Sequence, residues 1–401
     1  MMAKKGTRIV FVDDEPHVLG GIRRALTDME DEWSVSFCQS AAEALNLMSR
    51  EPVDVVVSDM RMPQMDGAQL LDAVRKQWPA TVRIILSGYA ESESVMRTVG
   101  PAHIYLAKPC DTAALQAAIQ RQVTLRTVLS NPDLRALLAG FTNLPSLPEP
   151  FLRLQAELQS KASSTARIAQ IIGQDIAMTA ELLKLTNSAY FAVASRVTTP
   201  AQAVRLLGVE TVQALVLRIG IFRQFSGTNR ALLEALTRYS LSIARLAERI
   251  ALAEGLPPSV VKMTYCAALL SDIGCVVLID GRPAGYHRVM TTVSPSLPLP
   301  DAERKEFGAD HGMIGGYLLG LWGFADPVVE AVTFSCEPKS CPTPDSPVFT
   351  ALMAARGLGP SMPLLPPACP DGCTDILGFL SKTYAEDRVQ HWRELAQEDK
   401  P

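Results

Sequence analysis

The sequence lacks several features that would assign it to a common class of protein. It holds no run of about 18 uncharged apolar residues, so we expect no membrane span. The N-terminal MMAKKGTRIVFVDDE has only a short apolar run, which acidic residues follow at once, so we expect no signal peptide. No low-complexity tract occurs and 20% of the residues are charged, which argues against long disordered regions. The net charge of −4 gives no hint of the basic face that binds nucleic acid.

Cysteine content and length set further limits. Eight Cys without a secretory signal favour reduced thiols. A chain of 401 residues is long enough for two or three domains, each with its own core. We therefore expect a multidomain cytoplasmic protein.

Five short apolar runs, rich in β-branched residues, punctuate the first 125 residues. They read RIVFV, VSFC, VDVVVS, RIILS and IYLA, and the intervals between them are long enough for helices. Strands that alternate with helices predict an α/β doubly wound fold, with a five-stranded parallel sheet covered on both faces. In such folds ligands bind beyond the carboxyl ends of the strands.

Polar side chains follow four of these runs at the point where each strand ends. Asp13 and Asp14 follow the first run, and Asp59 follows the third. Ser87 and Lys108 end the fourth and the fifth. Clustered carboxylates repel one another unless a cation joins them, and Mg²⁺ prefers such oxygen ligands. A carboxylate can also attack phosphorus, and an amine and a hydroxyl can stabilise the transferred phosphoryl group.

The motifs FVDDE, SDMRMPQMDG, ILSGYA and YLAKP resemble the receiver domain of bacterial two-component response regulators. The resemblance covers the whole segment, with four motifs in order. It implies that a sensor histidine kinase phosphorylates Asp59. It also implies that Mg²⁺ is bound by Asp13, Asp14, Asp59 and the backbone carbonyl of Arg61.

The same resemblance assigns roles to three further residues. Ser87 and Lys108 contact the phosphoryl group, and Tyr105 matches the aromatic switch that turns inward when the hydroxyl moves. The alternative for each single Asp is a turn or helix cap, and for Tyr105 a half-exposed strand aromatic. Independent caps would not supply the whole constellation, so we expect a receiver competent for phosphorylation.

A helical pattern from about Thr112 to Ser130 and four prolines between 132 and 150 mark a domain boundary near 130–145. The chain beyond it has a helical pattern almost throughout, so the second domain is predicted to be all-α. The predicted organisation is a receiver at 1–125, a helical linker at 126–145, an all-α output domain at 146–340, and a Pro-rich loop and helix at 341–401 that pack on the output domain.

Two helix starts in the second domain carry specific capping signals. Asp175 is placed to cap a helix that begins at Ile176. In TTPAQAVRLLG, Thr199 is predicted as the N-cap, Pro200 as the first helical residue and Gln202 as the partner that completes a capping box.

The segments LPSLPEP, IIGQDIAMTAELLKLTNSAYF and TTPAQAVRLLG resemble the HDOD domain, an all-helical output module related to the HD phosphohydrolases. The resemblance runs from about Phe141 and matches the C-terminal tail only loosely. HDOD proteins are generally regulatory scaffolds, often without a working metal site. The resemblance therefore implies no cofactor in this domain and a protein partner for it.

A working HD phosphohydrolase needs several His residues and an adjacent His–Asp pair to hold its metals. In AALLSDIG the residue before Asp272 is not His, and only His311 remains of the expected histidines. The other expected ligand positions read Tyr239, Ser271, Ser335 and Cys336. Two ligands are too few for a divalent transition metal, so we predict a vestigial site. His311 is expected to be a satisfied semi-buried residue paired with Asp272, or to line a ligand pocket with it.

Three further sequence patterns resemble known functional motifs, but each departs from its motif. Zinc binding by Cys336, Cys341, Cys369 and Cys373 is an alternative to free thiols, but the spacings depart from the usual two-residue knuckle. AGYHRV at 284–289 lacks the Pro of the Gly-Tyr-Pro signature of HD-GYP phosphodiesterases. GGYLLG sits in a predicted helix and follows no strand, so it is not a dinucleotide-binding loop.

The leading hypothesis is a response regulator in which phosphorylation of Asp59 controls a catalytically inactive HDOD domain that acts through protein–protein interaction. The alternative is a divergent HD-type metal-dependent phosphohydrolase, acting on a cyclic dinucleotide or nucleotide with Asp272 and His311. A third hypothesis, a DNA-binding regulator, is disfavoured because no basic recognition helix is present. We expect neither nucleic acid nor membrane as partner, and a homodimer is an open alternative because receivers often dimerise.

Overall fold

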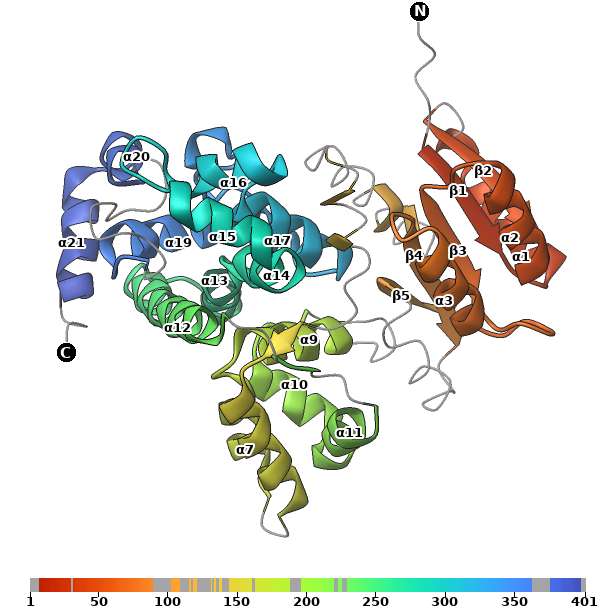
Figure 1. The fold of residues 1–401 in the computed structure, drawn as a ribbon, viewed down its shortest axis with the longest axis horizontal. Coiled ribbons are helices and arrows are strands. Elements are labelled where there is room, and N and C mark those ends of the chain that lie inside the picture. The colour runs from red at the N-terminus through yellow and green to blue at the C-terminus, as the bar shows by residue number, and fades with distance from the viewer. Residues whose placement is uncertain are drawn as a thin grey trace, which may run out of the picture. The chain divides into compact units, whose positions relative to one another are not determined.

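The computed structural model divides the chain into two compact units, which are described separately (Figure 1). The first unit comprises Met1–Thr142 with two short later pieces, Lys184–Ser195 and Leu321–Gly323, and the second comprises the remainder. The structure describes residues 7–29, 32–88, 102–108, 115–116, 118–120, 131, 133–134, 137–138, 144–160, 163–187, 196–219, 223–225, 229–362 and 376–397.

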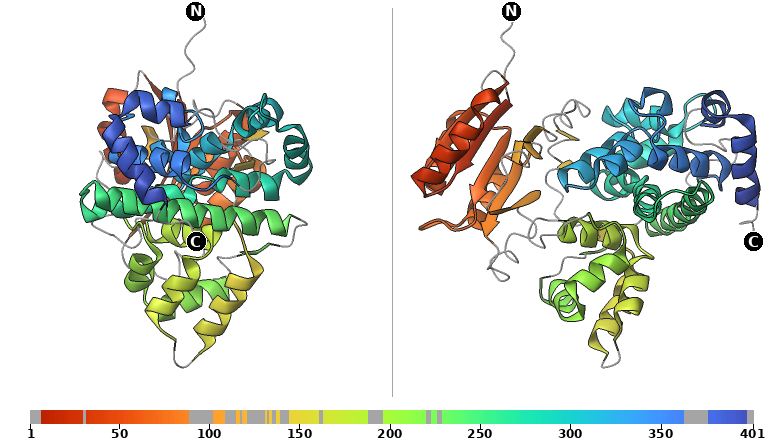
Figure 2. Two further views of the ribbon diagram at one scale, coloured as in Figure 1. Left: turned by 90° about the vertical axis from the view of Figure 1, so that its left-hand side faces the viewer. Right: turned by 180° about the vertical axis from the view of Figure 1, so that it is seen from behind.

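The first unit contains the predicted five-stranded parallel sheet, in the order β2-β1-β3-β4-β5. Its strands, red to orange in Figure 2, are β1 (Thr7–Val12), β2 (Trp33–Cys38), β3 (Val55–Asp59), β4 (Val82–Gly88) and β5 (Ile104–Lys108). Helices α1 (Pro16–Ala25), α2 (Ala41–Arg50) and α3 (Gly67–Gln77) alternate with the first four strands. Every residue of β3 is buried, as expected for an inner strand covered on both faces. The fold class predicted for this domain is confirmed.

Strand register brings the polar strand ends together. Val12 pairs with Ser58, so the next residues, Asp13 and Asp59, lie at adjacent strand ends. Asp59 pairs with Leu86 on the other side. The strand ends predicted from the sequence are therefore neighbours on one edge of the sheet.

A close approach holds the start of α3 against the end of β3. Asp66 caps α3 through a capping box with Gln69. A Cβ on Gly67 would clash with the backbone oxygen of Asp59. Gly67 is therefore required for the loop after Asp59 to return directly into a helix.

The second unit is built almost entirely of helices, as predicted, with the pair of short parallel strands β6 (Pro145–Ser146) and β7 (Arg223–Gln224). The helices are α7 (Pro148–Gln159), α8 (Thr165–Ile172), α9 (Ile176–Thr186), α10 (Pro200–Leu207), α11 (Val209–Gln213), the π-helix Ala214–Ile219, α12 (Arg230–Ala253), α13 (Pro258–Leu270), α14 (Ile273–Gly281), α15 (Pro283–Thr292), α16 (Leu299–Phe307), α17 (His311–Leu321), α18 (Asp326–Thr333), α19 (Pro347–Leu358), α20 (Ile376–Thr383) and α21 (Glu386–Gln397).

The two predicted helix caps are confirmed. Asp175 accepts a hydrogen bond from the backbone N–H of Met178 at 2.8 Å and a second from that of Leu147 at 2.6 Å. Thr199 and Gln202 form the complete capping box at the start of α10. Asp175 thus caps α9 and also fixes the start of α7.

The core of the second unit contains closely packed helices around α12, α13 and α19, which contact one another (Figure 1). A Cβ on Gly274 would clash with the backbone of His311, so the start of α14 approaches α17 more closely than any other residue would permit. A Cβ on Gly316 would likewise clash with Thr333. GGYLLG is therefore part of a helix whose glycines serve packing.

One described segment, Pro258–Gly281, is long and apolar enough to cross a membrane by length and composition. No membrane span is expected here from the sequence, because Lys262 and Asp272 interrupt the apolar residues of this segment. Its most apolar window is 83% buried inside the protein, and it forms α13 and α14. That burial is typical of core helices, and we treat the segment as such.

The C-terminal helices pack on the second unit. Trp392 of α21 is fully buried and donates a hydrogen bond to Glu254 at 2.7 Å, next to the end of α12. Arg249 of α12 donates to the backbone oxygen of Leu395 at 2.9 Å. Helices α20 and α21 also contact α19.

Two expectations fall on residues outside those described. Most of the helical pattern expected over 112–130 belongs to this group, as do Cys369 and Cys373. The zinc alternative therefore stays a hypothesis, although Cys336 and Cys341 form no disulfide bond with another described cysteine.

Candidate functional site

The first candidate site lies at the carboxyl edge of the parallel sheet. Lys108, at the end of β5, places its ammonium group 2.7 Å from a carboxylate oxygen of Asp13. The same ammonium group contacts a carboxylate oxygen of Asp59. One cation therefore bridges two carboxylates that come from two other strand ends.

Burial and hydrogen bonds define the chemical state of this site. Asp13 is 2% exposed and Asp59 is 8% exposed, whereas Asp14 is exposed. Burial raises the pKa of Asp59, although Lys108 and the backbone N–H of Arg61 oppose that rise. The N–H of Arg61 donates to Asp59 at 2.7 Å. Burial alone would lower the pKa of Lys108, but its bonds to Asp13 and Asp59 raise it.

The structure places Ser87 and Tyr105 by their backbone alone, because their side chains lie outside the described set. Ser87 pairs with Ala107 and Tyr105 pairs with Ile85 across β4 and β5. Lys108 pairs with Gly88, so Ser87 and Lys108 end neighbouring strands. The predicted hydroxyl and amine therefore come from the strands next to Asp59.

The arrangement suits both cation binding and phosphoryl chemistry. The bridging ammonium shows that Asp13 and Asp59 are close enough for one positive charge to join them. Carboxylate oxygens with an exposed third carboxylate, Asp14, fit a hard divalent cation such as Mg²⁺. A carboxylate next to an amine can also accept a phosphoryl group.

The second candidate site is a buried polar centre in the second unit, around Asp272. Arg356 of α19 donates from Nη1 to Asp272 at 2.8 Å and to Ser271 at 3.0 Å. Ser271 donates to the other carboxylate oxygen of Asp272 at 3.0 Å. Asp272 is fully buried, and the Arg356 side chain is 2% exposed. A guanidinium group therefore lies directly against the carboxylate that would hold a metal in an HD hydrolase.

A second chain of contacts runs through His311. Its Nδ1 lies 2.7 Å from a carboxylate oxygen of Glu303, which also accepts from the backbone N–H of His311 at 2.8 Å. Its Nε2 lies 3.1 Å from the Sγ of Cys336 and 3.7 Å from Asp272. The predicted pairing of His311 with Asp272 is thus a longer contact than those to Glu303 and Cys336.

The charges of this buried centre balance internally. Burial alone would raise the pKa of Asp272, but Arg356 and His311 lower it. Burial alone would lower the pKa of His311, but Cys275, Cys336 and Glu303 raise it well above its ordinary value. Arg356 offsets Asp272, and the Glu303–His311 pair is neutral overall whichever partner holds the shared proton. The charged groups of this centre are therefore arranged as two opposing pairs, Arg356 with Asp272 and His311 with Glu303.

Two potential ligand residues that the sequence did not predict lie beside His311. Cys275 and Glu303 join His311 in a group whose potential ligand atoms lie within 4.8 Å of one another. Cys275 is one helical turn after Asp272 and could have been noticed in the sequence. Glu303 and Arg356 lie on other helices, and no local pattern marks them.

The helix that would carry the first histidine also contributes a contact that the sequence did not predict. Ser240, which follows Tyr239 on α12, brings its hydroxyl to 3.4 Å from Asp272. Cys336 does reach the site as expected, with Ser335 beside it at 3.9 Å from the sulfur.

The residues of this centre do not fit a metal in their present arrangement. Thiolate, imidazole and carboxylate are ligand types that suit zinc. However, His311 bonds directly to Glu303 and contacts Cys336, while Arg356 bonds to Asp272. Burial raises the pKa of the Cys275 thiol to about 11, which disfavours the thiolate that a metal needs.

Comparison with protein families assigns both parts of the chain. The profile of the response regulator receiver domain matches residues 9–120, and that of the HDOD domain matches residues 144–338.

Two curated relatives match about a quarter of this chain each. The hydrogenase transcriptional regulatory protein HoxA of Cupriavidus necator is 40% identical over 104 residues, 26% of this chain and 21% of its own length. The transcriptional regulatory protein GlrR of Escherichia coli K12 is 37% identical over 119 residues, 29% of this chain and 26% of its own length. The chain thus spans about a quarter or less of the length of these relatives.

Two solved structures match larger parts of the chain. The signal receiver domain of an HD domain-containing protein from Pseudomonas fluorescens Pf-5 is 29% identical, with a TM-score of 0.29, over 31% of this chain and 98% of that one. The MmoQ response regulator fragment of Methylococcus capsulatus is 22% identical, with a TM-score of 0.45, over 54% of this chain and 83% of that one. The two family models alone, at 9–120 and 144–338, show that the chain joins a response regulator receiver domain to an HDOD domain.

Proposed function

We propose that this protein is a two-component response regulator whose phosphoacceptor is Asp59. The observation that carries the proposal is the convergence of Asp13, Asp59 and Lys108 at one edge of the sheet. Asp59 has one carboxylate oxygen on the Lys108 amine and the other on the backbone N–H of Arg61, so both neighbours would orient it for attack on phosphorus. A sensor histidine kinase is the partner that would supply the phosphoryl group.

Mg²⁺ would be held by Asp13, Asp14, Asp59 and the backbone carbonyl of Arg61. When bound, it would supply positive charge that screens the carboxylates and the transferred phosphoryl group. Lys108 would keep one carboxylate contact and turn its remaining N–H bonds to a phosphoryl oxygen. Ser87 would donate to another phosphoryl oxygen, and Tyr105 would follow its movement.

The HDOD domain acts, in this proposal, as a catalytically inactive output module that binds another protein. The support is the buried centre, in which Arg356 bonds to Asp272 and His311 bonds to Glu303. Each group that could hold a metal already has a protein partner, and none is exposed to solvent. A phosphorylation-dependent change in the receiver need only shift the output equilibrium by about 1–3 kcal/mol to regulate it.

We propose the organisation predicted from the sequence: a receiver at 1–125, a linker at 126–145, an output domain at 146–340 and a C-terminal segment at 341–401. The hydrogen bonds from Trp392 to Glu254 and from Arg249 to Leu395 support packing of that segment on the output domain. A cytoplasmic location and a homodimer formed through the receiver belong to the same proposal.

Beryllofluoride with Mg²⁺ tests the phosphoacceptor directly. We expect saturable binding to the full chain, loss of binding in Asp59→Asn, and wild-type binding in Asp72→Asn, an Asp on the surface of α3 paired with Arg75 and Lys76. Pull-downs with beryllofluoride-treated wild type and with Asp59→Asn would then compare output partners. Equal response of Asp59→Asn and wild type would contradict the proposal.

The Cys275–Glu303–His311 group is the observation that favours one alternative function, that of a metal-dependent phosphohydrolase acting on a nucleotide or cyclic dinucleotide. That function requires metal-stimulated turnover that Asp272→Ala abolishes. Absence of turnover with Zn²⁺, Mn²⁺ and Fe²⁺ would support the inactive output domain.

A further inference from the structure

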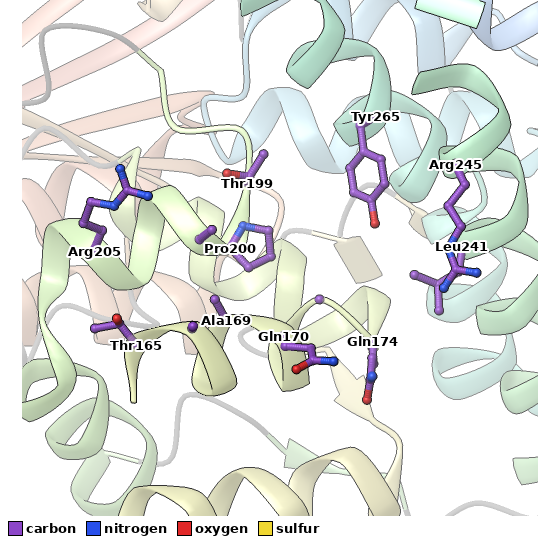
Figure 3. Close-up of a pocket in the computed structure, with 13 residues that line it drawn as sticks. Thr165, Ala169, Gln170, Gln174, Thr199, Pro200, Arg205, Leu241, Arg245 and Tyr265 are labelled. Atoms are coloured by element: carbon purple, nitrogen blue, oxygen red, sulfur yellow. The ribbon is translucent and has the colours of Figure 1, made fainter. Parts of the chain in front are cut away.

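A cleft in the second unit, separate from the buried centre, has an unexplained chemical character. It encloses about 560 Å³, within the roughly 300–1,000 Å³ typical of small-molecule sites. One wall consists of α8 and α10, and the other of α12 and α13 (Figure 3). The residues that line it are Thr165, Ala166, Ala169, Gln170, Gly173, Gln174, Thr199, Pro200, Ala201, Arg205, Leu241, Arg245 and Tyr265.

The charge of the lining has one sign. Among the described residues that line the cleft, two are arginines and none is acidic. Both arginines are exposed, and neither Arg205 nor Arg245 forms an ion pair with another described residue. This contrasts with Arg304, which lies elsewhere in the unit and pairs with Asp301, Asp310 and Glu337. Unpaired arginines on facing walls make the cleft attractive to anions.

The two arginines lie on opposite sides of the cleft in Figure 3, so they would not clamp a single phosphate between them. Arg205 lies on the side of Thr165, and Arg245 lies beside Leu241 and Tyr265. The cleft therefore favours an elongated ligand with an anionic group at each end.

Two helix starts add to the positive character of the wall formed by α8 and α10. Thr165 and Ala166 begin α8, on the side of Arg205, and Ala201 follows the first residue of α10. The backbone N–H groups of a first helical turn have no partner within their helix and favour anions. The side chains of Ser164 and Thr199 already accept a hydrogen bond from one backbone N–H group in each of these first turns. The helix starts therefore attract anions less strongly than the two arginines do.

The middle of the cleft offers flat and apolar surface with amide hydrogen-bonding groups. Figure 3 shows the Tyr265 ring directed into the cleft across from Pro200. Gln170 and Gln174 lie along the same wall as α8, and Gln174 is already engaged by Arg153 at 2.9 Å. A planar heterocycle could stack against Tyr265 while Gln170 reads its polar edge.

We propose that this cleft binds a small molecule with two separated phosphate groups and a planar ring, the chemistry of a short dinucleotide. Arg205 and Arg245 bind the phosphates at the two ends, and Tyr265 holds the ring between them. Because the ligand contacts α8 and α10 on one wall and α12 and α13 on the other, it fixes the spacing of the two walls. Binding would make the shape of the output domain depend on the ligand, independently of Asp59.

Calorimetric titration of the full chain in EDTA tests the proposal, because removal of divalent cations takes the acidic cluster around Asp59 out of consideration. The probes are the linear dinucleotide pApA, AMP and inorganic pyrophosphate. We expect pApA to bind most tightly. Arg205→Gln and Arg245→Gln should each weaken it by about tenfold, the usual worth of one charge-assisted hydrogen bond.

Matched variants separate a site from general electrostatics. Arg393→Gln removes one exposed arginine from α21, outside the cleft, and should leave pApA affinity unchanged. Tyr265→Phe should retain affinity within about twofold, since the ring remains, while Tyr265→Leu should weaken pApA more than pyrophosphate. Unchanged thermal melting of the Arg variants would show that they fold.

Three results would overturn the proposal. The first is no binding of pApA up to about 5 mM, far weaker than a functional site requires. The second is equal weakening by Arg393→Gln and Arg245→Gln. The third is equal affinity for pApA and pyrophosphate, which would reduce the cleft to unspecific anion attraction. None of these results bears on phosphorylation of Asp59.

Discussion

Removal of the guanidinium group of Arg356 should destabilise the second unit strongly. In Arg356→Met the fully buried carboxylate of Asp272 loses a 2.8 Å bond to a guanidinium group, and among the described residues His311, at 3.7 Å, is the positive partner that remains. At an effective dielectric constant of about 20, two unit charges about 4 Å apart attract by about 4 kcal/mol. The bonds from Ser271 and Ser240 remain, so we expect a loss of about 3–4 kcal/mol in the free energy of unfolding at pH 7.

The pH dependence of this loss follows from the carboxylate. In the wild type, Arg356 and His311 lower the pKa of Asp272 against the effect of burial. Ionised Asp272 therefore stabilises the folded state at pH values above the unfolded pKa of about 3.9, and this stabilisation is lost as the pH falls through the lower folded pKa. In Arg356→Met burial is opposed less, the pKa of Asp272 rises above the unfolded value, and stability falls as the pH rises. The penalty should therefore be larger at pH 7 than near pH 4.5.

Urea unfolding of the full chain, followed by far-ultraviolet circular dichroism, measures these changes because the helical signal comes mainly from the second unit. Arg356→Met combined with Asp272→Asn should recover about 2 kcal/mol relative to Arg356→Met alone, since no buried charge is left unpaired. Arg230→Met, which breaks the exposed pair with Glu234, should cost about 0.5 kcal/mol at most. A loss below about 1 kcal/mol for Arg356→Met, or no coupling in the double variant, would refute the reasoning.

Three smaller predictions concern local features of the second unit. Burial raises the pKa of Asp175 to about 6, above its unfolded value. Ionisation of Asp175 should therefore lower the free energy of unfolding by about 3 kcal/mol as the pH rises from 4 to 7, and in urea titrations Asp175→Asn should lose this pH dependence. Gly274→Ala should cost about 3 kcal/mol or more because its Cβ would clash with the backbone of His311; a melting temperature within a degree of wild type would contradict the packing. Thr199→Ala should cost about 1 kcal/mol by removing the capping box, whereas Thr199→Ser should retain most of it.

The receiver was predictable from the sequence because its information is local. Each of Asp13, Asp59 and Lys108 directly ends an apolar run, and the rule that parallel strands end at one edge then brings them together. The caps at Asp175 and Thr199 were predictable for the same reason, since a cap and its partner lie within three residues.

The buried centre of the second unit was predictable only in part. Asp272 and His311 carry motif information, but their partners lie on other helices. Arg356 is 84 residues after Asp272, and Glu303 lies on α16, eight residues before His311. Helical periodicity shows that such residues face a core, but it does not show which of them meet. From the sequence alone the site therefore has too few metal ligands. The structure adds the guanidinium group of Arg356, a cation that bonds to Asp272.

The bond between Arg356 and Asp272 also bears on how this domain can change during evolution. Restoring a histidine at Ser271 would place an imidazole against the guanidinium group that already bonds to that position, so the first step towards a metal site meets a positive charge. Losing Arg356 first would leave Asp272 buried without its counter-charge, which destabilises the fold before any metal could compensate. Each single substitution towards a metal site, at Ser271 or at Arg356, is therefore expected to be unfavourable, and only a change of both residues together would avoid the penalty.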